Sequence, residues 1–296
     1  MFKILKKQLL APQIYLMDIE APRVARSAQP GQFIIVRPDE KGERIPLTIC
    51  DYDKEKGSVT IVFQTVGKST TRMATFNEGD YYADFVGPLG QPSEMVHEPL
   101  EELRQKKILF IAGGVGTAPV YPQVKWLNQH GVKADVIIGA KSENYLLLTG
   151  EMKAEVENMF IATDDGSVGF KGLVTNLLQD LVVNQNKHYD LVVAIGPMIM
   201  MKFVAKMTQE LGIRTIVSLN TLMVDGTGMC GACRVTVGGE TKFTCVDGPE
   251  FDGHKVNFDE AMRRQTMYKT EEGKTIIEKQ EKEEGHECRI GGISNE

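Results

Sequence analysis

Residues 107–119 read KILFIAGGVGTAP, and this run sets the fold class of the central part of the chain. Its first half, Lys107–Ala112, is a short apolar segment that predicts a buried strand. A glycine-rich turn follows directly and opens a helix, so small residues allow a dinucleotide to approach the backbone while the helix N-terminus favours phosphate. The turn lacks the G-x-G-x-x-G spacing, and its place at the carboxyl end of the first strand is what makes it informative.

Three further apolar runs downstream predict buried strands of the same sheet. Helical patterning fits between them, which is typical of a doubly wound parallel sheet. Two of the strands end in the turns Thr163–Ser167 and Gly196–Met198, and carboxyl ends of parallel strands share one edge, so these turns could line one crevice. Asp-Gly and Gly-Pro are also common in ordinary loops. The predicted strands cover residues 134–138, 159–163 and 190–195.

Upstream of residue 86 the chain reads as short strands between turns, which predicts a small antiparallel barrel. Arg44–Ile49 ends one strand with a cation, a rigid proline and a hydroxyl. Val66–Thr71 opens a short helix whose amides and hydroxyls could hold a pyrophosphate, although an ordinary capped helix start has the same pattern. A polar, helix-like stretch at 98–105 leads to the parallel sheet. The expected barrel strands are residues 32–36, 58–63 and 81–85.

The strongest chemical signal is the segment Asp225–Cys233, DGTGMCGAC, with Cys245 following after eleven residues. Two thiolates separated by two residues can bind one metal or adjacent positions of a cluster, and the glycines let backbone amides turn towards sulfur. A short strand pair over residues 234–244 then returns the chain and brings Cys245 to the same place.

Asp225 is the local candidate for a fourth ligand of a [2Fe-2S] cluster. It lies five positions before Cys230, where the C-x4-C-x2-C spacing of plant-type ferredoxins has a cysteine. The alternative is a zinc site, since three cysteines with Asp225 or His254 could also form a tetrahedron. The glycine-rich loop and the spacing favour the cluster.

Composition narrows the classes of function. A length of 296 residues with 42% hydrophobic content suits two compact domains and a small appendage, and a formal net charge of -6 argues against nucleic-acid binding. No stretch is long and apolar enough for a membrane span, and the first residues lack the core of a secretion signal. An odd number of cysteines, three of them within sixteen positions, favours a metal site in the reducing cytoplasm. The cysteines are Cys50, Cys230, Cys233, Cys245 and Cys288.

In order, the motifs Arg-x-Pro-Leu-Thr, Gly-Lys-Ser-Thr, Gly-Pro-Leu-Gly, Gly-Gly-Val-Gly-Thr-Ala-Pro and the cysteine loop resemble the ferredoxin-NADP reductase superfamily, and within it the iron-sulfur branch. The resemblance spans residues 1 to about 268. It implies an FAD-binding barrel, an NAD(P)-binding α/β domain and a [2Fe-2S] module. The implied flavin ligands are Arg44, Pro46, Leu47 and Thr48 for the ring and Gly67, Lys68, Ser69 and Thr70 for the phosphates. The implied nucleotide ligands are Gly113, Gly114, Gly116 and Thr117, with Asp164 and Gly196 nearby, and the implied cluster ligands are Asp225, Cys230, Cys233 and Cys245.

Two families of this branch are the closest in pattern, and Asp225 separates them. The electron-transfer subunit of class 1B dihydroorotate dehydrogenase has a cysteine as its first cluster ligand, whereas the small subunit of NADH-dependent reduced ferredoxin:NADP oxidoreductase has an aspartate. The resemblance to the second implies electron transfer between NAD(H), FAD and the cluster, and onward to a larger flavoprotein subunit with [4Fe-4S] clusters. Such a reaction needs no nucleophile or general acid from the protein, so no catalytic residue is assigned.

Several alternatives stay open from the sequence. The chain could instead serve dihydroorotate dehydrogenase, or be a zinc-stabilised interaction module without turnover. No arginine pair near residues 140–142 is placed for a 2′-phosphate, which favours NAD while leaving NADP possible. The predicted domains are residues 1–99, 100–219 and 220–260, followed by a charged tail over 261–296.

Overall fold

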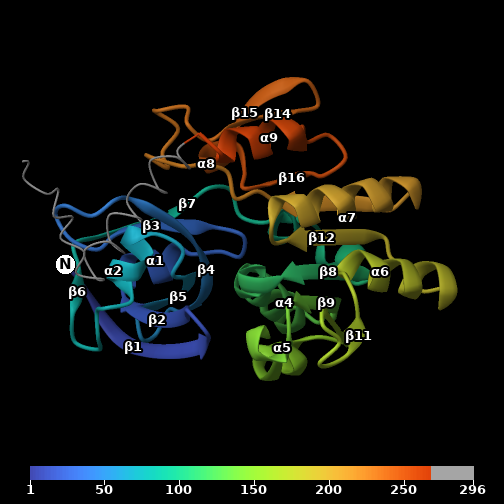
Figure 1. Cartoon of the computed structure of the whole chain (residues 1–296), viewed down its shortest axis with the longest axis horizontal. Helices are drawn as coiled ribbons and strands as arrows, with labels where there is room; N and C mark the ends of the chain where they lie inside the picture. The colour runs from blue at the N-terminus through green and yellow to red at the C-terminus, as the bar shows by residue number, and fades with distance from the viewer. Residues whose placement is uncertain (268–296) are drawn as a thin grey trace, which may run out of the picture.

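A computed structural model describes residues 1–267 of the chain. Figure 1 shows a barrel of antiparallel strands, a parallel sheet with helices on both faces, and a small module at residues 220–267 that lies against both. The predicted fold class, a β-barrel plus a doubly wound α/β domain with a small C-terminal module, is therefore confirmed. The domain boundaries stay predictions, and residues 268–296 of the predicted tail, with Cys288, lie outside the described residues.

The barrel is one seven-stranded sheet in the order β6-β1-β2-β5-β4-β3-β7, with every neighbouring pair antiparallel. Its two edge strands are consecutive in the chain and are separated by Ala83 alone, so the sheet must curl until its edges approach each other. The single strand predicted over residues 81–85 was therefore wrong, because the chain passes from one edge to the other at Ala83. The strands are β1 Phe2–Ala11, β2 Ile14–Glu20, β3 Phe33–Arg37, β4 Ile45–Asp53, β5 Ser58–Gln64, β6 Tyr81–Tyr82 and β7 Asp84–Leu89.

Apolar side chains at alternate positions along the strands fill the core of the barrel. Met17 and Ile19 of β2 and Val59 and Ile61 of β5 are fully buried two residues apart, which is the period of a strand with one face in a core. Two short helices complete this part, α1 Pro22–Ser27, which adds Val24 and Ala25 to the core, and α2 Lys68–Met73.

The second sheet has the order β11-β10-β9-β8-β12-β13-β16 and is parallel except for β16. Successive residues of β8 enter opposite cores: Leu109 and Ile111 pack with α6 and α7, and Ile108 and Phe110 pack with α4 and α5. A strand covered on both faces must be apolar throughout, which is why the run at residues 107–112 could be predicted as a buried strand from the sequence. The strands are β8 Ile108–Gly113, β9 Asp135–Ala140, β10 Met159–Thr163, β11 Phe170–Lys171, β12 Leu191–Ile195 and β13 Arg214–Ser218.

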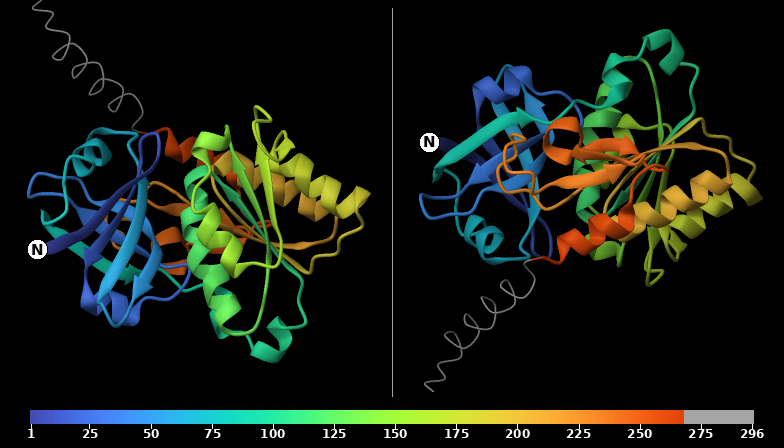
Figure 2. Two further views of the ribbon diagram at one scale, coloured as in Figure 1. Left: turned by 90° about the horizontal axis from the view of Figure 1, so that it is seen from below. Right: turned by 90° about the horizontal axis from the view of Figure 1, so that it is seen from above.

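Helices connect these strands and cover the two faces of the sheet, as the two views of Figure 2 show. The longest are α4 Thr117–Gln129 and α7 Met198–Glu210, and the described part holds no helix long and apolar enough to cross a bilayer. The helix-like stretch predicted at residues 98–105 is the short helix α3. The remaining helical elements are η1 Glu94–His97, α3 Leu100–Leu103, η2 Gly114–Gly116, η3 Glu143–Tyr145, α5 Thr149–Glu155, α6 Val174–Gln179 and η4 Asp180–Asn184.

Residues 220–267 form the cysteine module. Its hairpin turns at Gly238 and Gly239, whose φ angles of 60° and 83° suit a tight two-residue turn. The strand β16 joins the edge of the parallel sheet by pairing antiparallel with β13, and α9 packs against α7. The module is thereby attached to the α/β domain at two places. Its elements are β14 Arg234–Val237, β15 Glu240–Phe243, α8 Thr244–Asp247, β16 Glu250–Asp252 and α9 Phe258–Gln265.

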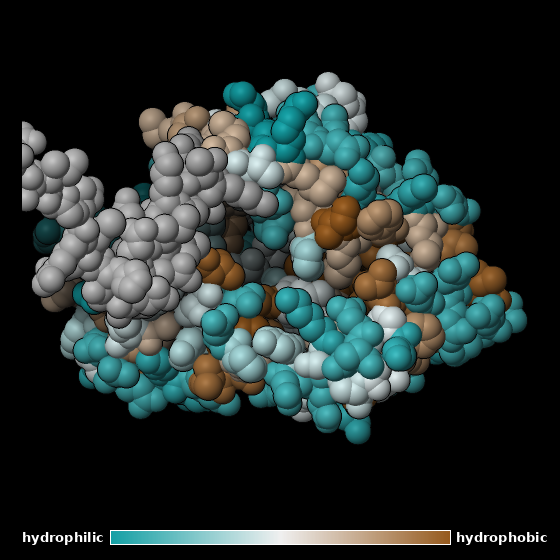
Figure 3. All heavy atoms as spheres, in the orientation of Figure 1, coloured by the Kyte–Doolittle hydropathy of each residue, from teal (hydrophilic) through white to brown (hydrophobic). Residues whose placement is uncertain are grey.

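The barrel and the α/β domain meet through a small apolar cluster that includes the buried Cys50 and Ala118. Beside it, Lys125 of α4 donates to both carboxylate oxygens of Asp51 on β4, at 2.8 and 2.7 Å. Cys50 is buried within this interface cluster, and burial raises the pKa of its thiol. In the space-filling view, hydrophobic residues line a hollow between the two domains (Figure 3).

Candidate functional site

The first half of β4 carries the predicted ring-binding residues. Arg44 directly precedes the strand, and Pro46, Leu47 and Thr48 pair with β3 alone, because pairing with β5 begins at Ile49. The other edge of this half-strand has no strand beside it within the described chain, which is also why a proline is tolerated there. All four residues are partly exposed. An open strand edge with free backbone groups is a suitable place for a planar ring with polar edges.

The second predicted flavin segment lies next to the first. The Ser69 hydroxyl is hydrogen-bonded to the carboxylate of Glu43, the neighbour of Arg44. The Thr70 hydroxyl accepts from the backbone N–H groups of Val66 and Gly67 at 3.0 and 3.1 Å, so Thr70 caps α2. The ordinary capping role considered from the sequence is thus present at Thr70.

The same segment nevertheless leaves space for a ligand. Lys68 is exposed, and a Cβ added at Gly67 would meet no heavy atom within 4 Å. The contact of Ser69 with Glu43 therefore places the segment that begins at Gly67 next to Arg44.

The predicted nucleotide crevice lies where the strand order reverses. From β8 the chain builds β9, β10 and β11 on one side and then crosses to β12 on the other, so the turns after β8 and β12 face each other. A Cβ on Gly116 would lie 2.2 Å from the carbonyl oxygen of Ile195, and one on Gly196 would lie 3.0 Å from Cα of Gly113. These three glycines let the two turns pack against each other.

Gly114 differs from the other glycines of the turn. Its φ is +54°, and a Cβ there would meet nothing within 4 Å, so it borders open space at the N-terminus of α4. Thr117 is fully buried, and its hydroxyl donates to the Gly114 carbonyl at 2.9 Å. Thr117 therefore shapes the turn, whereas Gly114 is where a ligand can approach the backbone.

The remaining predicted residues of the crevice lie at its rim. Asp164 is exposed after β10, and its backbone N–H donates to the carbonyl of Ala140 at the end of β9. Met198 is buried in the core, but Met200 lies against both glycine turns, with its Sδ 2.5 Å from the Cβ position of Gly113. Met200 was missed from the sequence because helix periodicity alone does not show which methionine of α7 points back to the turn.

The cysteine loop contacts the flavin segment directly. Nη2 of Arg44 donates to the backbone carbonyl of Asp225 at 3.0 Å, across 181 residues of sequence. Gly226, with φ of +84°, packs so closely that a Cβ there would lie 2.8 Å from Ile35 of β3. Two predicted sites from opposite ends of the chain are therefore adjacent.

Within the loop, two of the predicted ligands are buried and in contact, and a third is exposed. Cys233 and Cys245 are each 2% exposed, and their Sγ atoms are 3.3 Å apart. Cys230 is exposed, and the amides of Ala232 and then Asp225 stabilise its thiolate and lower its pKa. Burial, together with the adjacent Cys233, raises the pKa of Cys245 to about 12.

Asp225 keeps its carboxylate within the loop. Oδ2 accepts from the Thr227 amide at 2.9 Å and from the Thr227 hydroxyl. These bonds, with a smaller contribution from the Arg44 charge, hold the pKa of Asp225 below its usual range.

A single-metal site is not preformed. Among residues 1–267, no three acidic, thiol or imidazole groups are gathered closely enough to hold one ion. His254, the other ligand considered for zinc, is hydrogen-bonded to Thr208 at 3.1 Å. The structure thus brings Cys233 and Cys245 together, with Cys230 and Asp225 in the same loop but not around one point.

Comparison with known proteins agrees with this arrangement. A family model for the iron-sulfur cluster binding domain of dihydroorotate dehydrogenase B matches residues 220–257. An uncharacterized protein of Clostridium beijerinckii is 64% identical over 292 residues, 99% of this chain and 98% of its own length. The dihydroorotate dehydrogenase B (NAD(+)) electron transfer subunit homolog of Thermotoga maritima is 44% identical over 270 residues, 91% of this chain and 92% of its own length.

A solved structure extends the similarity to three dimensions. A chain of the NADH-dependent reduced ferredoxin-NADP oxidoreductase, determined in work on flavin-based electron bifurcation, is 42% identical and superimposes with a TM-score of 0.86. The match covers 94% of this chain and 96% of that one. The chain therefore belongs to the family of dihydroorotate dehydrogenase B electron transfer subunits and their homologs, within the ferredoxin-NADP reductase superfamily, as a subunit of an NAD(P)H-dependent oxidoreductase.

Proposed function

We propose that the chain binds FAD, a nicotinamide nucleotide and one [2Fe-2S] cluster, and transfers electrons between them and a larger partner subunit. The observation that carries this proposal is the 3.0 Å hydrogen bond from Arg44 to the Asp225 carbonyl. It joins the flavin segment to the cysteine loop, and electron transfer requires two cofactors that lie close together.

The cysteine loop fits a cluster better than a zinc ion. The Sγ atoms of Cys233 and Cys245 are 3.3 Å apart, but no third acidic, thiol or imidazole group within residues 1–267 is gathered with them to hold one ion. A cluster with two irons takes its ligands in two pairs rather than around one point. Cys233 with Cys245 would hold one iron, and Cys230 with Asp225 would hold the other. Three sulfurs and one carboxylate are a donor set that iron accepts.

The barrel fits a flavin through one buried atom of Arg44 that lacks a hydrogen-bond partner. Nε of Arg44 is buried and makes no hydrogen bond within the described residues. A buried donor normally has an acceptor, and a flavin at the open edge of β4 would supply one. The adjacent Gly67 and Lys68 would hold its phosphates, and rearrangement of the Glu43 contact would free Ser69. A bound flavin exchanges two electrons with a nicotinamide and one with iron.

The crevice between β8 and β12 fits the nicotinamide nucleotide. The open space at Gly114 lies at the N-terminus of α4, where free amides favour phosphate. Asp164 and Gly196 border it. Residues Ala140, Lys141 and Ser142 at the end of β9 include no arginine, so we propose NAD(H) as the main nucleotide, with NADP(H) as a possible second.

Asp225 in the first ligand position favours NADH-dependent reduced ferredoxin:NADP oxidoreductase as the complex to which the chain belongs. Its partner would be a larger cytoplasmic flavoprotein subunit with [4Fe-4S] clusters. The described chain supplies no cysteine set for such clusters. In this proposal the chain oxidises the nicotinamide nucleotide, and the larger partner subunit carries out the electron bifurcation.

Purified alone, the chain should oxidise NADH with an artificial acceptor but fail to reduce NADP with reduced ferredoxin. Adding the larger subunit should restore the second reaction. If the isolated chain performs the complete reaction, the proposed division of labour is wrong.

The second candidate is the electron transfer subunit of an NAD-dependent dihydroorotate dehydrogenase. The family model matched at residues 220–257 and the Thermotoga maritima relative favour it. Affinity purification of the native complex separates the two: a dihydroorotate-oxidising protein supports this candidate, and a large flavoprotein with [4Fe-4S] clusters supports the first.

A further inference from the structure

Glu250 lies at the junction of three parts of the molecule. It begins β16 of the cysteine module, and its Oε1 accepts from Nε2 of Gln123 on α4 at 2.8 Å. The carbonyl of Pro30 on the barrel accepts from the amide of Ser93 in the segment that leads to the α/β domain. A Cβ on Gly31 would lie 2.8 Å from that amide and 3.2 Å from Oε1 of Glu250. The Glu250 carboxyl is therefore enclosed by three structural units.

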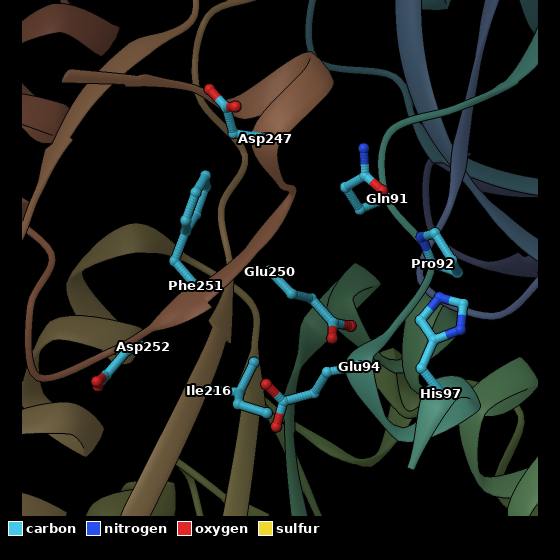
Figure 4. Close-up of a pocket in the computed structure, with 9 residues that line it drawn as sticks. All are labelled: Gln91, Pro92, Glu94, His97, Ile216, Asp247, Glu250, Phe251 and Asp252. Carbon is cyan, nitrogen blue, oxygen red and sulfur yellow. The ribbon is translucent and has the colours of Figure 1, made fainter. Parts of the chain in front are cut away.

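A cavity of 370 Å³ borders this carboxyl, and Figure 4 shows Glu250 pointing into it between β16 and the segment at residues 91–97. The other charged or titratable groups that line the cavity are Glu94, His97, Asp247 and Asp252. Glu94 is paired with Arg214 of β13 at 2.6 Å. Within residues 1–267 no cation forms an ion pair with Glu250.

Two buried oxygens of this contact lack hydrogen-bond partners in the described part of the chain: Oε2 of Glu250 and Oε1 of Gln123. Gln123 is only 1% exposed. Leaving a buried polar group unsatisfied costs about 1–3 kcal/mol, so the coincidence needs a physical reason.

A proton on Glu250 supplies that reason. The neutral acid would donate from Oε2 to Oε1 of Gln123 while Oε1 accepts from Nε2, which closes a ring of two hydrogen bonds between an acid and an amide. Burial raises the pKa of Glu250 to about 7, with a smaller contribution from the negative charge of Glu94 and against the effect of Ser93 and Gln123.

We propose that Glu250, as the neutral acid, is the positioning residue that fastens the cysteine module to the nucleotide-binding helix α4, and that loss of its proton loosens this attachment. Cys245 lies five residues before Glu250 in the same module. The contact therefore controls how firmly the cysteine loop is held against the nucleotide domain. This inference names a regulation of the proposed electron path, but the attachment itself does not depend on the identity of the cofactors.

The direction of the pH effect follows from the raised pKa. The folded carboxyl holds its proton to about pH 7, whereas an opened, hydrated one releases it near the usual 4.5. The attachment is therefore strongest below about pH 4.5, weakens as the pH rises through 7, and changes little above that.

The test is amide hydrogen exchange of β16 and β13 in the full chain, with iron and FAD content measured in each sample. Corrected for the intrinsic rate, the opening equilibrium of wild type should rise at least tenfold between pH 5.5 and 8. In Glu250→Gln, the amide can make the same ring without a proton, so the equilibrium should change less than twofold. The matched control is Glu240→Gln, an exposed glutamate of the same module, which should keep the wild-type pH dependence.

A wild-type chain with no pH dependence would overturn the proposal, and so would a Glu250→Gln variant with the wild-type slope. If Glu250→Gln fails to fold, Gln123→Leu gives a second route: it removes the ring's partner, and opening should be at least tenfold greater at pH 5.5. Unchanged opening in that variant would also refute it. Normal exchange results with no iron or FAD bound would contradict the proposed function and leave this inference standing.

Discussion

The nucleotide crevice and the cysteine loop are both rich in glycine, but the two places need glycine for different physical reasons. At the crevice, Gly113, Gly116 and Gly196 allow two turns to touch, and any side chain there would overlap neighbouring atoms. In the cysteine loop, Gly226, Gly228 and Gly231 have positive φ angles of 84°, 89° and 66°. Close packing therefore accounts for Gly113, Gly116 and Gly196 of the crevice, whereas a positive φ is what the three glycines of the cysteine loop share.

This difference separates stability from ligand binding. A substitution in the crevice should destabilise the fold whether or not nucleotide is bound. A substitution of a cysteine in the loop should remove a ligand while the rest of the fold persists.

The largest effect is expected at the buried sulfur pair. Cys245→Ser should lose nearly all bound iron, because Cys245 is half of the only pair of thiols in contact within residues 1–267. Iron analysis and visible absorbance measure the loss. Cys50→Ala is the control and should keep its iron. Iron retained in Cys245→Ser would show that Cys245 is not a cluster ligand.

Next in size is the crevice. Gly116→Val should lower the free energy of unfolding by about 3 kcal/mol, because its Cβ would lie 2.2 Å from the backbone oxygen of Ile195. Urea denaturation measures this change. Gly67→Ala is the matched control, with nothing within 4 Å and an extended backbone, and should change stability by less than about 0.5 kcal/mol. Equal effects in the two variants would mean that packing does not explain the crevice.

A smaller effect is expected at Asp225, which is exposed to solvent on one side. Asp225→Ala should retain part of the iron but alter the electron paramagnetic resonance spectrum of the reduced protein, since an oxygen ligand is replaced. Asp225→Cys should restore full iron content with a different spectrum. An unchanged spectrum in the alanine variant would show that Asp225 is not a ligand.

The smallest effect concerns the contact between barrel and nucleotide domain. Lys125→Met should cost about 1 kcal/mol of stability, because Lys125 and Asp51 form a partly shielded ion pair at 2.7 Å. Thermal unfolding at low and high salt measures it. Lys56→Met removes an exposed ion pair with Asp53 at 3.5 Å and should have almost no effect on stability. A loss of stability in this control larger than in Lys125→Met would contradict the stabilising role of the Lys125–Asp51 pair.

Local patterns made most of the fold predictable. The strand and turn at residues 107–119 were readable because burial on both faces requires an unbroken apolar run. The division of residues 81–89 into two strands at Ala83 could not be predicted from the sequence, because it depends on closure of the barrel. The strand β16 could not be predicted either, because it has three residues and pairs with β13, an edge of the parallel sheet that lies far from it in the sequence.

The residues of the candidate site could be proposed from the sequence, but the contacts between them could not. The cysteine spacing indicated a metal site, and the glycine turns indicated a nucleotide. Nothing in the sequence indicated that Arg44 bonds the Asp225 carbonyl, because such a contact exists only once both modules are folded. The roles of Thr117 and Met200 likewise depend on which way a side chain turns within its helix.

The central claim is that Asp225, Cys230, Cys233 and Cys245 hold a [2Fe-2S] cluster beside an FAD. The most direct measurement is the iron, acid-labile sulfide and FAD content of full-length protein prepared without oxygen. We predict about two irons, about two sulfides and about one FAD per chain. A well-folded protein that instead contains zinc, with no sulfide and no flavin, would contradict the claim.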